Sequence, residues 1–168
     1  MKVRRGSHAD EILAEIHEYG IYLERREVWY HGYICDSGHE SDPGVEYRSI
    51  NMFIKNLRYL DATTEKPILI HFNSTGGDWY YGMGAYNAIE NCESLVIILM
   101  YGPCMSMGSI IPLAADKVVV MPDTTLMIHD GTTDISDDMT AKQGQSWAEL
   151  ERVNQDRMLE IYTKARRS

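Results

Sequence analysis

The hydrophobic positions of this chain change their spacing along its length, and that spacing predicts the order of its elements. Residues 9–20 and 47–59 place apolar side chains every three or four positions, which predicts two amphipathic helices, the first ending at Gly20. Helices are also predicted at residues 79–91 and 105–115. Strand and helix alternate, which predicts an α/β fold with mainly parallel pairing. Short apolar runs typical of buried parallel strands occupy residues 68–72 and 95–100, and further strands are predicted at 28–34, 117–121 and 126–129.

Polar stretches and one long helix complete the predicted order. Residues 35–44 and 131–137 are rich in Asp, Gly, Ser and Thr, which predicts loops. A long helix with an apolar stripe is then predicted at residues 139–166. Because the chain ends while still in this helix, we expect either an interaction arm or a chain that stops within its domain.

Composition narrows the class of protein. The 168 residues suit one domain, and the net charge of −9 argues against a broad nucleic-acid or anionic-membrane surface. Cys35, Cys92 and Cys104 have no metal-ligand spacing and cannot all pair, which fits a reducing compartment and predicts no metal site. No apolar run approaches the roughly 20 residues of a membrane span, and no signal peptide is evident. We therefore expect a cytoplasmic protein with neither a nucleic-acid nor a membrane partner.

A glycine-rich turn is the first candidate for chemistry. Gly76 and Gly77 lie in the stretch Phe72–Asp78, between a predicted buried strand and a predicted helix. Two glycines allow positive φ and a close approach of a substrate backbone, and amides beside a helix N-terminus can stabilise an oxyanion. Taken alone, the same residues favour a tight turn that binds nothing.

A serine and a histidine are the other candidates. Ser106 follows the predicted strand 95–100 where a helix begins, so its hydroxyl could lie beside helix-terminal amides. Serine is also a favoured helix cap, and Cys104 breaks the Gly-x-Ser-x-Gly pattern of hydrolase elbows. His129 ends the predicted strand 126–129, where an imidazole could act as a general base or simply be hydrogen-bonded structure.

The order and spacing of the three motifs resemble a known family. Asn73–Gly77, Met105–Ser109 and Met127–Gly131 follow one another, with 29 residues from Gly77 to Ser106 and 23 from Ser106 to His129. This pattern resembles the ClpP-type serine proteases, the proteolytic subunits of the Clp machines, over about residues 22–165. Segments 27–32 and 82–86 resemble the family as well.

The resemblance implies a fold and an organisation. The fold is α/β, a crotonase-like spiral of ββα units with a protruding handle helix. The chain is then a single ClpP-like domain over residues 1–168, with an N-terminal segment at 1–21, a head at 22–137 and a handle helix at 138–168, and its C-terminal part missing.

The resemblance also implies roles for four residues. Ser106 is the nucleophile, His129 is the base that takes its proton, and the backbone N–H groups of Gly77 and Met107 form the oxyanion hole. The assignment makes chemical sense because a serine hydroxyl is a weak nucleophile until an imidazole removes its proton. Cys104 is the alternative nucleophile, although we expect it to be a small packed residue.

Departures from the family pattern concern the third triad member and the turns. The family's aspartate lies after the handle helix, beyond Ser168, and nothing places Asp130, Asp156 or Glu160 at the imidazole. We therefore expect either a fragment or a naturally short, inactive relative. Thr75 also replaces a proline of the family's glycine turn.

The expected function is that of a serine endopeptidase subunit. It would hydrolyse unfolded polypeptides inside a heptameric ring, singly or as a double ring, fed by an AAA+ unfoldase. The chain has no phosphate-binding loop, so no cofactor is expected on it. The alternatives are a catalytically impaired structural or assembly subunit of a ClpP-like ring, and a crotonase-type acyl-CoA enzyme, which needs no serine nucleophile.

Overall fold

The computed structural model describes residues 8–32, 44–131 and 139–165. The chain divides into two compact units, Met1–Met127 and Ile128–Ser168, and each is described by itself. The single domain expected from the sequence stays a prediction. Most of the two predicted loops, and the end of the strand predicted at 28–34, lie outside the described residues.

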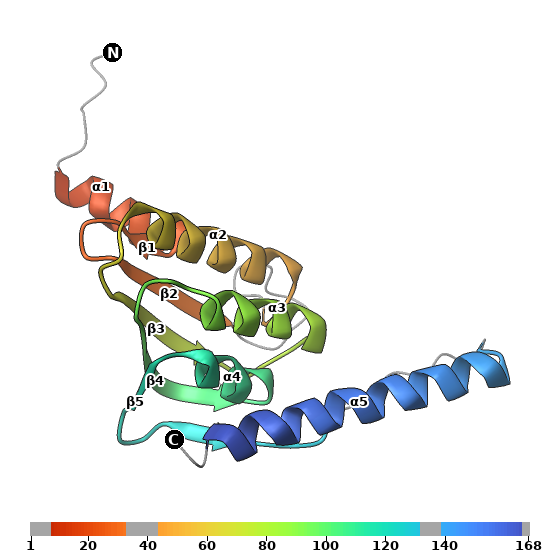
Figure 1. Cartoon of the computed structure of the whole chain (residues 1–168). Helices are drawn as coiled ribbons and strands as arrows, with labels where there is room; N and C mark the ends of the chain where they lie inside the picture. The colour runs from red at the N-terminus through yellow and green to blue at the C-terminus, as the bar shows by residue number, and fades with distance from the viewer. Residues whose placement is uncertain (1–7, 33–43, 132–138, 166–168) are drawn as a thin grey trace. The chain divides into compact units, whose positions relative to one another are not determined.

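A six-stranded sheet forms the centre of the first unit (Figure 1). Its strands follow the order β1-β2-β3-β4-β5. The sixth strand, β6, pairs with the last residues of β4, after the stretch of β4 that pairs with β5. The β1–β2 pair is antiparallel and every other pair is parallel, which confirms the predicted pairing. The strands are β1 Ile21–Tyr22, β2 Glu27–Gly32, β3 Ile68–Ser74, β4 Val96–Met105, β5 Lys117–Val120 and β6 Thr125–Met127.

Two helices of the first unit, α2 and α3, begin at positions capped by a side chain. Glu46 accepts hydrogen bonds from the Arg48 and Ser49 N–H groups as α2 starts, and Asp78 accepts one from Tyr81 as α3 starts. Gly20 ends the first helical segment with φ 63°, as the sequence predicts. The helices are α1 His8–Ala14 with the π-helical turn Glu15–Tyr19, α2 Tyr47–Thr63, α3 Trp79–Glu90, and α4 Met107–Ile110 with the 3₁₀ turn Ile111–Ala114.

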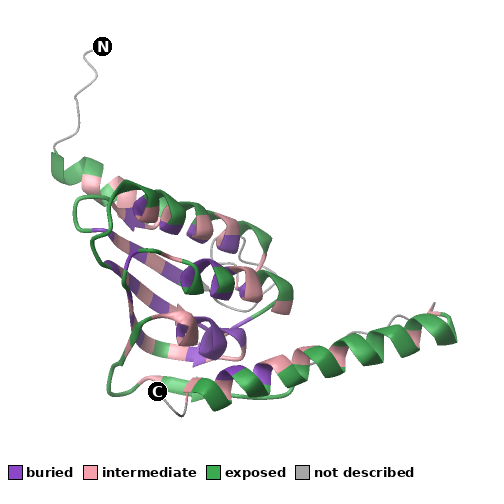
Figure 2. Cartoon of the chain, in the orientation of Figure 1, coloured by how far each residue is buried: buried purple, intermediate pink, exposed green. Residues whose placement is uncertain are grey.

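The core lies between the sheet and helices α2 and α3. Burial alternates strictly along β3, so one face of the strand is enclosed and the other is half-buried (Figure 2). Tyr30 of β2 joins the layers, because its ring lies 5.3 Å from both Phe53 of α2 and Phe72 of β3. Burial raises the pKa of Tyr30 to about 12, against a smaller lowering by the hydrogen bond with Ser49.

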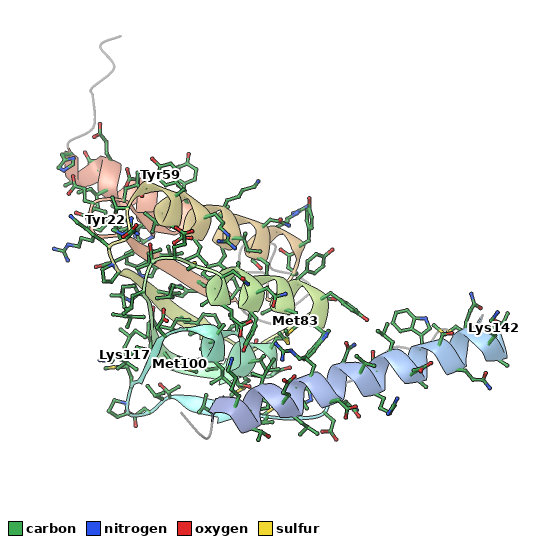
Figure 3. All side chains as sticks on the ribbon, viewed as in Figure 1. Tyr22, Tyr59, Met83, Met100, Lys117 and Lys142 are labelled. Atoms are coloured by element: carbon green, nitrogen blue, oxygen red, sulfur yellow. The ribbon has the colours of Figure 1, made fainter. Side chains whose placement is uncertain are left out.

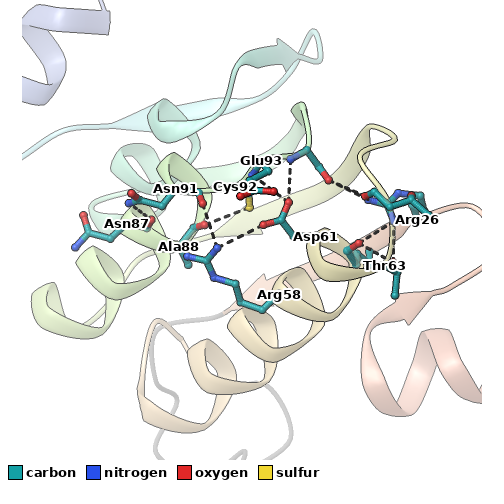
Figure 4. Close-up of polar contacts among 12 residues, drawn as sticks. Arg26, Arg58, Asp61, Thr63, Asn87, Ala88, Asn91, Cys92 and Glu93 are labelled. Carbon is teal, nitrogen blue, oxygen red and sulfur yellow. Dashed lines mark hydrogen bonds and ion pairs between the residues drawn. The ribbon is translucent and has the colours of Figure 1, made fainter.

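A buried arginine ties the sheet to the end of α2 (Figure 4). The guanidinium of Arg26 donates to the carbonyls of Leu60 at 2.8 Å, Thr64 at 2.9 Å and Lys66 at 2.9 Å, and to Ser94 Oγ at 3.2 Å. A cation beside the last carbonyls of a helix is favoured by the helix dipole. Nothing in the local sequence predicts this network, because its acceptors lie 34 to 68 residues away.

Asp61 of α2 fixes the segment before β4 in the same region. Its Oδ1 accepts from the Glu93 N–H at 3.1 Å and the Ser94 N–H at 2.9 Å. Burial works to raise the pKa of Asp61, but the hydrogen bonds from Ser94 and Glu93 and the charge of Arg58 outweigh it, so the pKa is lowered.

Several predicted boundaries around Ser106 and before His129 are wrong. The strand predicted at 95–100 continues to Met105, because a register shift between Phe72 and Ser74 of β3 accommodates the segment that contains Gly102. The helix predicted at 105–115 therefore begins only at Met107. The strand predicted at 126–129 ends at Met127, and its side chains are exposed.

The second unit consists mainly of the helix α5, Ala141–Ala165, which confirms the long helix predicted at 139–166. Met158 and Ile161 are its buried residues. Within the described ranges, no helix is both long and apolar enough to cross a membrane.

Candidate active site

The glycine turn follows β3 and is clamped by a residue that sequence reasoning missed. Val45 pairs with Gly77 in an isolated parallel bridge. The Val45 N–H donates to the Gly76 carbonyl at 2.9 Å, and the Asp78 N–H donates to the Val45 carbonyl at 2.8 Å. The residues on either side of Gly77 thus make the bridge bonds, and the N–H of Gly77 is left outside them.

Only glycine fits at the two turn positions. Gly76 has φ 101° and Gly77 has φ 149°, values that favour glycine. A Cβ on Gly77 would collide with the Val45 backbone, being 2.8 Å from its nitrogen. The Ser74 hydroxyl accepts from the Gly76 N–H at 3.1 Å and holds the start of the turn.

Ser106 lies between the end of β4 and the start of α4 in an uncommon conformation. Its φ is 51° and its ψ −128°, outside the regions that L-residues other than glycine ordinarily occupy. It occupies the N-cap position of α4, but its side chain does not cap the helix. The capping role that serine often plays is therefore not the reason for a serine here.

The two turns are packed directly against each other. A Cβ on Gly76 would lie 2.6 Å from Ser106 Cβ and 2.9 Å from the Met107 nitrogen. Gly108 is equally close to Ser74, because a Cβ there would meet the Ser74 backbone. The structure thus brings Ser106 and Met107 together with the Gly76–Gly77 turn, across 29 residues of sequence.

Met107 combines a buried side chain with an available amide. It is the first residue of α4, so its N–H has no acceptor within the helix. Its side chain is buried against Gly82 of α3, where a Cβ would collide with the Met107 thioether. This packing fixes the turn that carries the Met107 N–H.

His129 belongs to the second unit, whereas Ser106 belongs to the first. The pairing of the two side chains therefore stays a prediction. Met127, two residues before His129, is anchored beside Ser106. The Ser106 N–H donates to the Met127 carbonyl at 2.8 Å, and Ser109 Oγ donates to the same carbonyl at 3.3 Å. The chain reaches His129, which is exposed, two residues after this anchor.

Cys104 is a packed residue. Its side chain is fully buried, and its thiol lies 3.8 Å from the Phe72 carbonyl. Burial raises the pKa of the Cys104 thiol, which disfavours the nucleophilic thiolate. Among residues 8–32, 44–131 and 139–165, no group of three His, Cys, Asp or Glu side chains could hold a metal ion.

Comparisons with known proteins define the family. The Clp protease family model matches residues 42–167. The chain therefore belongs to the Clp protease family.

Individual relatives cover less of the chain. The ATP-dependent Clp protease proteolytic subunit of Deinococcus radiodurans is 32% identical over 91 residues, which is 52% of this chain and 45% of the relative. Proteolytic subunit 3 of Synechococcus sp. strain CC9605 is 32% identical over 95 residues, 55% of this chain and 46% of the relative. The chain thus spans a little under half the length of the curated relatives it matches.

A solved structure shows the same fold. A mutant of ClpP1 from Listeria monocytogenes superposes with a TM-score of 0.68 and 22% identity, covering 85% of this chain and 73% of that one. This confirms the predicted α/β, crotonase-like fold.

Proposed function

We propose that this chain is a serine endopeptidase subunit in which Ser106 is the nucleophile and His129 the general base. Membership of the Clp protease family supports a peptidase. The observation that carries the residue assignment is the strained backbone of Ser106, pressed against the Gly76–Gly77 turn. Such strain persists only where the surrounding structure imposes it, and it concentrates at functional sites.

The proposed reaction uses groups from both turns. Ser106 Oγ attacks the scissile carbonyl carbon while its proton passes to His129. The N–H groups of Gly77 and Met107 stabilise the oxyanion, and each backbone donor of this kind contributes about 10² to 10³ in rate. The C–N bond then breaks, and His129 gives its proton to the leaving amine.

Water completes the cycle. His129 removes a proton from water, whose oxygen attacks the acyl ester on Ser106, and the acid product leaves as the hydroxyl re-forms.

The proposed substrate and partners follow from the family. We place the chain in a heptameric ring, single or double, that encloses the active sites and receives unfolded polypeptide from an AAA+ unfoldase. The subunit itself is proposed to need no cofactor, since the ATP is used by the unfoldase.

Hydrolysis of an unstructured fluorogenic peptide tests the proposal. The wild-type chain should cleave it, and Ser106→Ala or His129→Ala should each reduce kcat at least about 10³-fold. Cys104→Ser is the matched control for the alternative nucleophile and should retain a substantial rate. Equal cleavage by Ser106→Ala would overturn the assignment, and an inert wild type would favour the structural-subunit alternative.

A further inference from the structure

Exposed tyrosines gather where α2 and α3 begin, beside the glycine turn. Tyr47, the first residue of α2, is 60% exposed, and Tyr81, in the first turn of α3, is 41% exposed. Their rings meet edge to face with centroids 5.8 Å apart. We call Tyr47 and Tyr81 the tyrosine pair. Two large aromatic rings held together at the surface form a platform for a ligand group.

The tyrosine pair is tied to Gly77 from both sides. Val45, which bridges Gly77, precedes Tyr47 by two residues, a path of at most about 7.6 Å between Cα atoms. On the other side, Asp78 follows Gly77 and accepts a hydrogen bond from the Tyr81 N–H at 2.9 Å. A substrate whose scissile carbonyl binds at the Gly77 N–H would therefore bring a neighbouring side chain to the tyrosine pair.

The charges around the tyrosine pair favour a cation. Glu46 precedes Tyr47, and Asp78 lies three residues before Tyr81. Both carboxylates are fixed because they cap the helices: Glu46 Oε1 accepts from the backbone N–H of Arg48 at 2.9 Å, and Asp78 accepts from the backbone N–H of Tyr81. Tyrosine faces attract ammonium and guanidinium groups, and nearby carboxylates add to that attraction. Arg48, exposed in the first turn of α2, is the opposing charge.

We propose that the tyrosine pair, with Glu46 and Asp78, is a specificity subsite that accepts a lysine or arginine side chain of the substrate near the scissile bond. The proposal rests on the proposed function, since that function places the scissile carbonyl at Gly77. An apolar side chain would contact the same rings but gain nothing from the two carboxylates.

Peptide binding to the Ser106→Ala chain measures the preference without turnover. Fluorescein-labelled peptides of alanine and serine carry one central lysine, methionine or glutamate. Because the other residues are small, the peptide can shift along the site until the central side chain reaches the tyrosine pair. By fluorescence anisotropy, the lysine peptide should bind at least about fivefold more tightly than the methionine peptide, and the glutamate peptide most weakly.

Substitutions within the subsite should change this preference in defined directions. Tyr47→Ala or Tyr81→Ala should reduce it about three- to fivefold, the contribution of one exposed cation–π contact. Asp78→Asn removes the charge but keeps a good helix cap, and should reduce it about twofold. Arg48→Gln should increase it by a similar factor.

Two controls separate this effect from general destabilisation. Tyr81→Phe keeps the ring and should keep the preference. Tyr59→Ala removes an equally exposed tyrosine from α2 near its other end (Figure 3), and should leave all three affinities within twofold.

The outcomes separate the subsite from the proposed function. Equal affinity for lysine and methionine peptides, a tighter methionine peptide, or no measurable binding would overturn the subsite. A lysine preference that disappears in Tyr47→Ala and Tyr81→Ala would support it even if the wild-type chain cleaves nothing, in which case the proposed function alone fails. Peptide cleavage by the wild-type chain without any lysine preference would overturn the subsite and leave the proposed function standing.

Discussion

In the part of the chain that the structure describes, Arg26 and Ser106 are the two non-glycine residues with positive φ, at 58° and 51°. Arg26 is 7% exposed, and its own side chain holds it in place through hydrogen bonds to the carbonyls around the end of α2. Ser106 is held from outside, by the glycine turn packed on its Cβ and by the Met127 carbonyl bonded to its N–H.

The difference lies in what offsets the cost of each strained conformation. A residue in a sparsely populated conformation costs on the order of 1–3 kcal/mol. At Arg26 the side chain offsets that cost, so the fold explains which residue is there. At Ser106 the side chain makes no capping hydrogen bond to α4, and glycine would adopt the same positive φ without strain. Under the proposed function, a serine occupies this position because its hydroxyl attacks the substrate.

Replacing Ser106 by glycine gives the largest expected effect and tests this contrast. Ser106→Gly should lower kcat for peptide hydrolysis at least about 10³-fold. It should also raise the free energy of unfolding by about 1 kcal/mol, because glycine adopts positive φ without strain. Urea unfolding followed by circular dichroism measures the second effect. Ser106→Ala is the control, with the same loss of activity and no gain in stability; a loss of stability in Ser106→Gly would contradict the account.

The same substitution at Arg26 should have the opposite effect on stability. Arg26→Gly also relieves a positive φ, but it leaves the carbonyls of Leu60, Thr64 and Lys66 without their donor. We expect a net loss of about 3 kcal/mol in the free energy of unfolding. Arg26→Lys should lose less, about 2 kcal/mol, since one ammonium cannot reach all the acceptors. A stabilised Arg26→Gly chain would remove the contrast.

Gly76→Ala tests whether the glycine turn holds Ser106 in place. The new Cβ would lie 2.6 Å from Ser106 Cβ, so the two turns must separate. We expect a loss of about 2 kcal/mol in stability, together with at least tenfold slower hydrolysis. Gly144→Ala in α5, where a Cβ meets nothing within 4 Å, is the matched control and should gain about 1 kcal/mol. Unchanged hydrolysis in Gly76→Ala would show that the contact is not needed.

The smallest expected effect concerns Asp61, which holds the Ser94 end of the Arg26 network. Its folded pKa lies below its unfolded value of about 3.9, so ionised Asp61 stabilises the fold above that pH and stops doing so as the pH falls through the folded pKa. Asp61→Asn should cost about 1 kcal/mol at pH 7. The difference from wild type should shrink below about pH 4. A pH-independent difference between the two unfolding curves would rule out the charge as its origin.

Sequence patterns predicted most of the fold because most of its elements carry a local signal. The apolar run at residues 68–72 and the helical spacing at 47–59 both reflect burial, and both elements formed where predicted, although the strand continues to Ser74 and the helix to Thr63. The extension of β4 to Met105 could not be predicted, because it depends on a register shift against β3. The Arg26 network was missed for the same reason, since distant segments supply its acceptors.

The candidate site divides in the same way. The three motifs and their order were visible in the sequence, and the structure packs the first two together at Ser106 and Gly76 and bonds Met127, the first residue of the third, to the Ser106 N–H. The bridge between Val45 and Gly77 could not be predicted, because a valine after a polar stretch occurs in many structural contexts. The strain at Ser106 also needed the structure, since a positive φ at serine is not a propensity that sequence can express.

Reaction with a fluorophosphonate tests the central claim most directly, because the reagent bonds to an activated serine oxygen. Mass spectrometry of the digested wild-type chain should find one adduct per chain, located on Ser106, and should find none in Ser106→Gly or His129→Ala. An assembled wild-type protein that forms no adduct, or an adduct on another residue that survives in Ser106→Gly, would contradict the account.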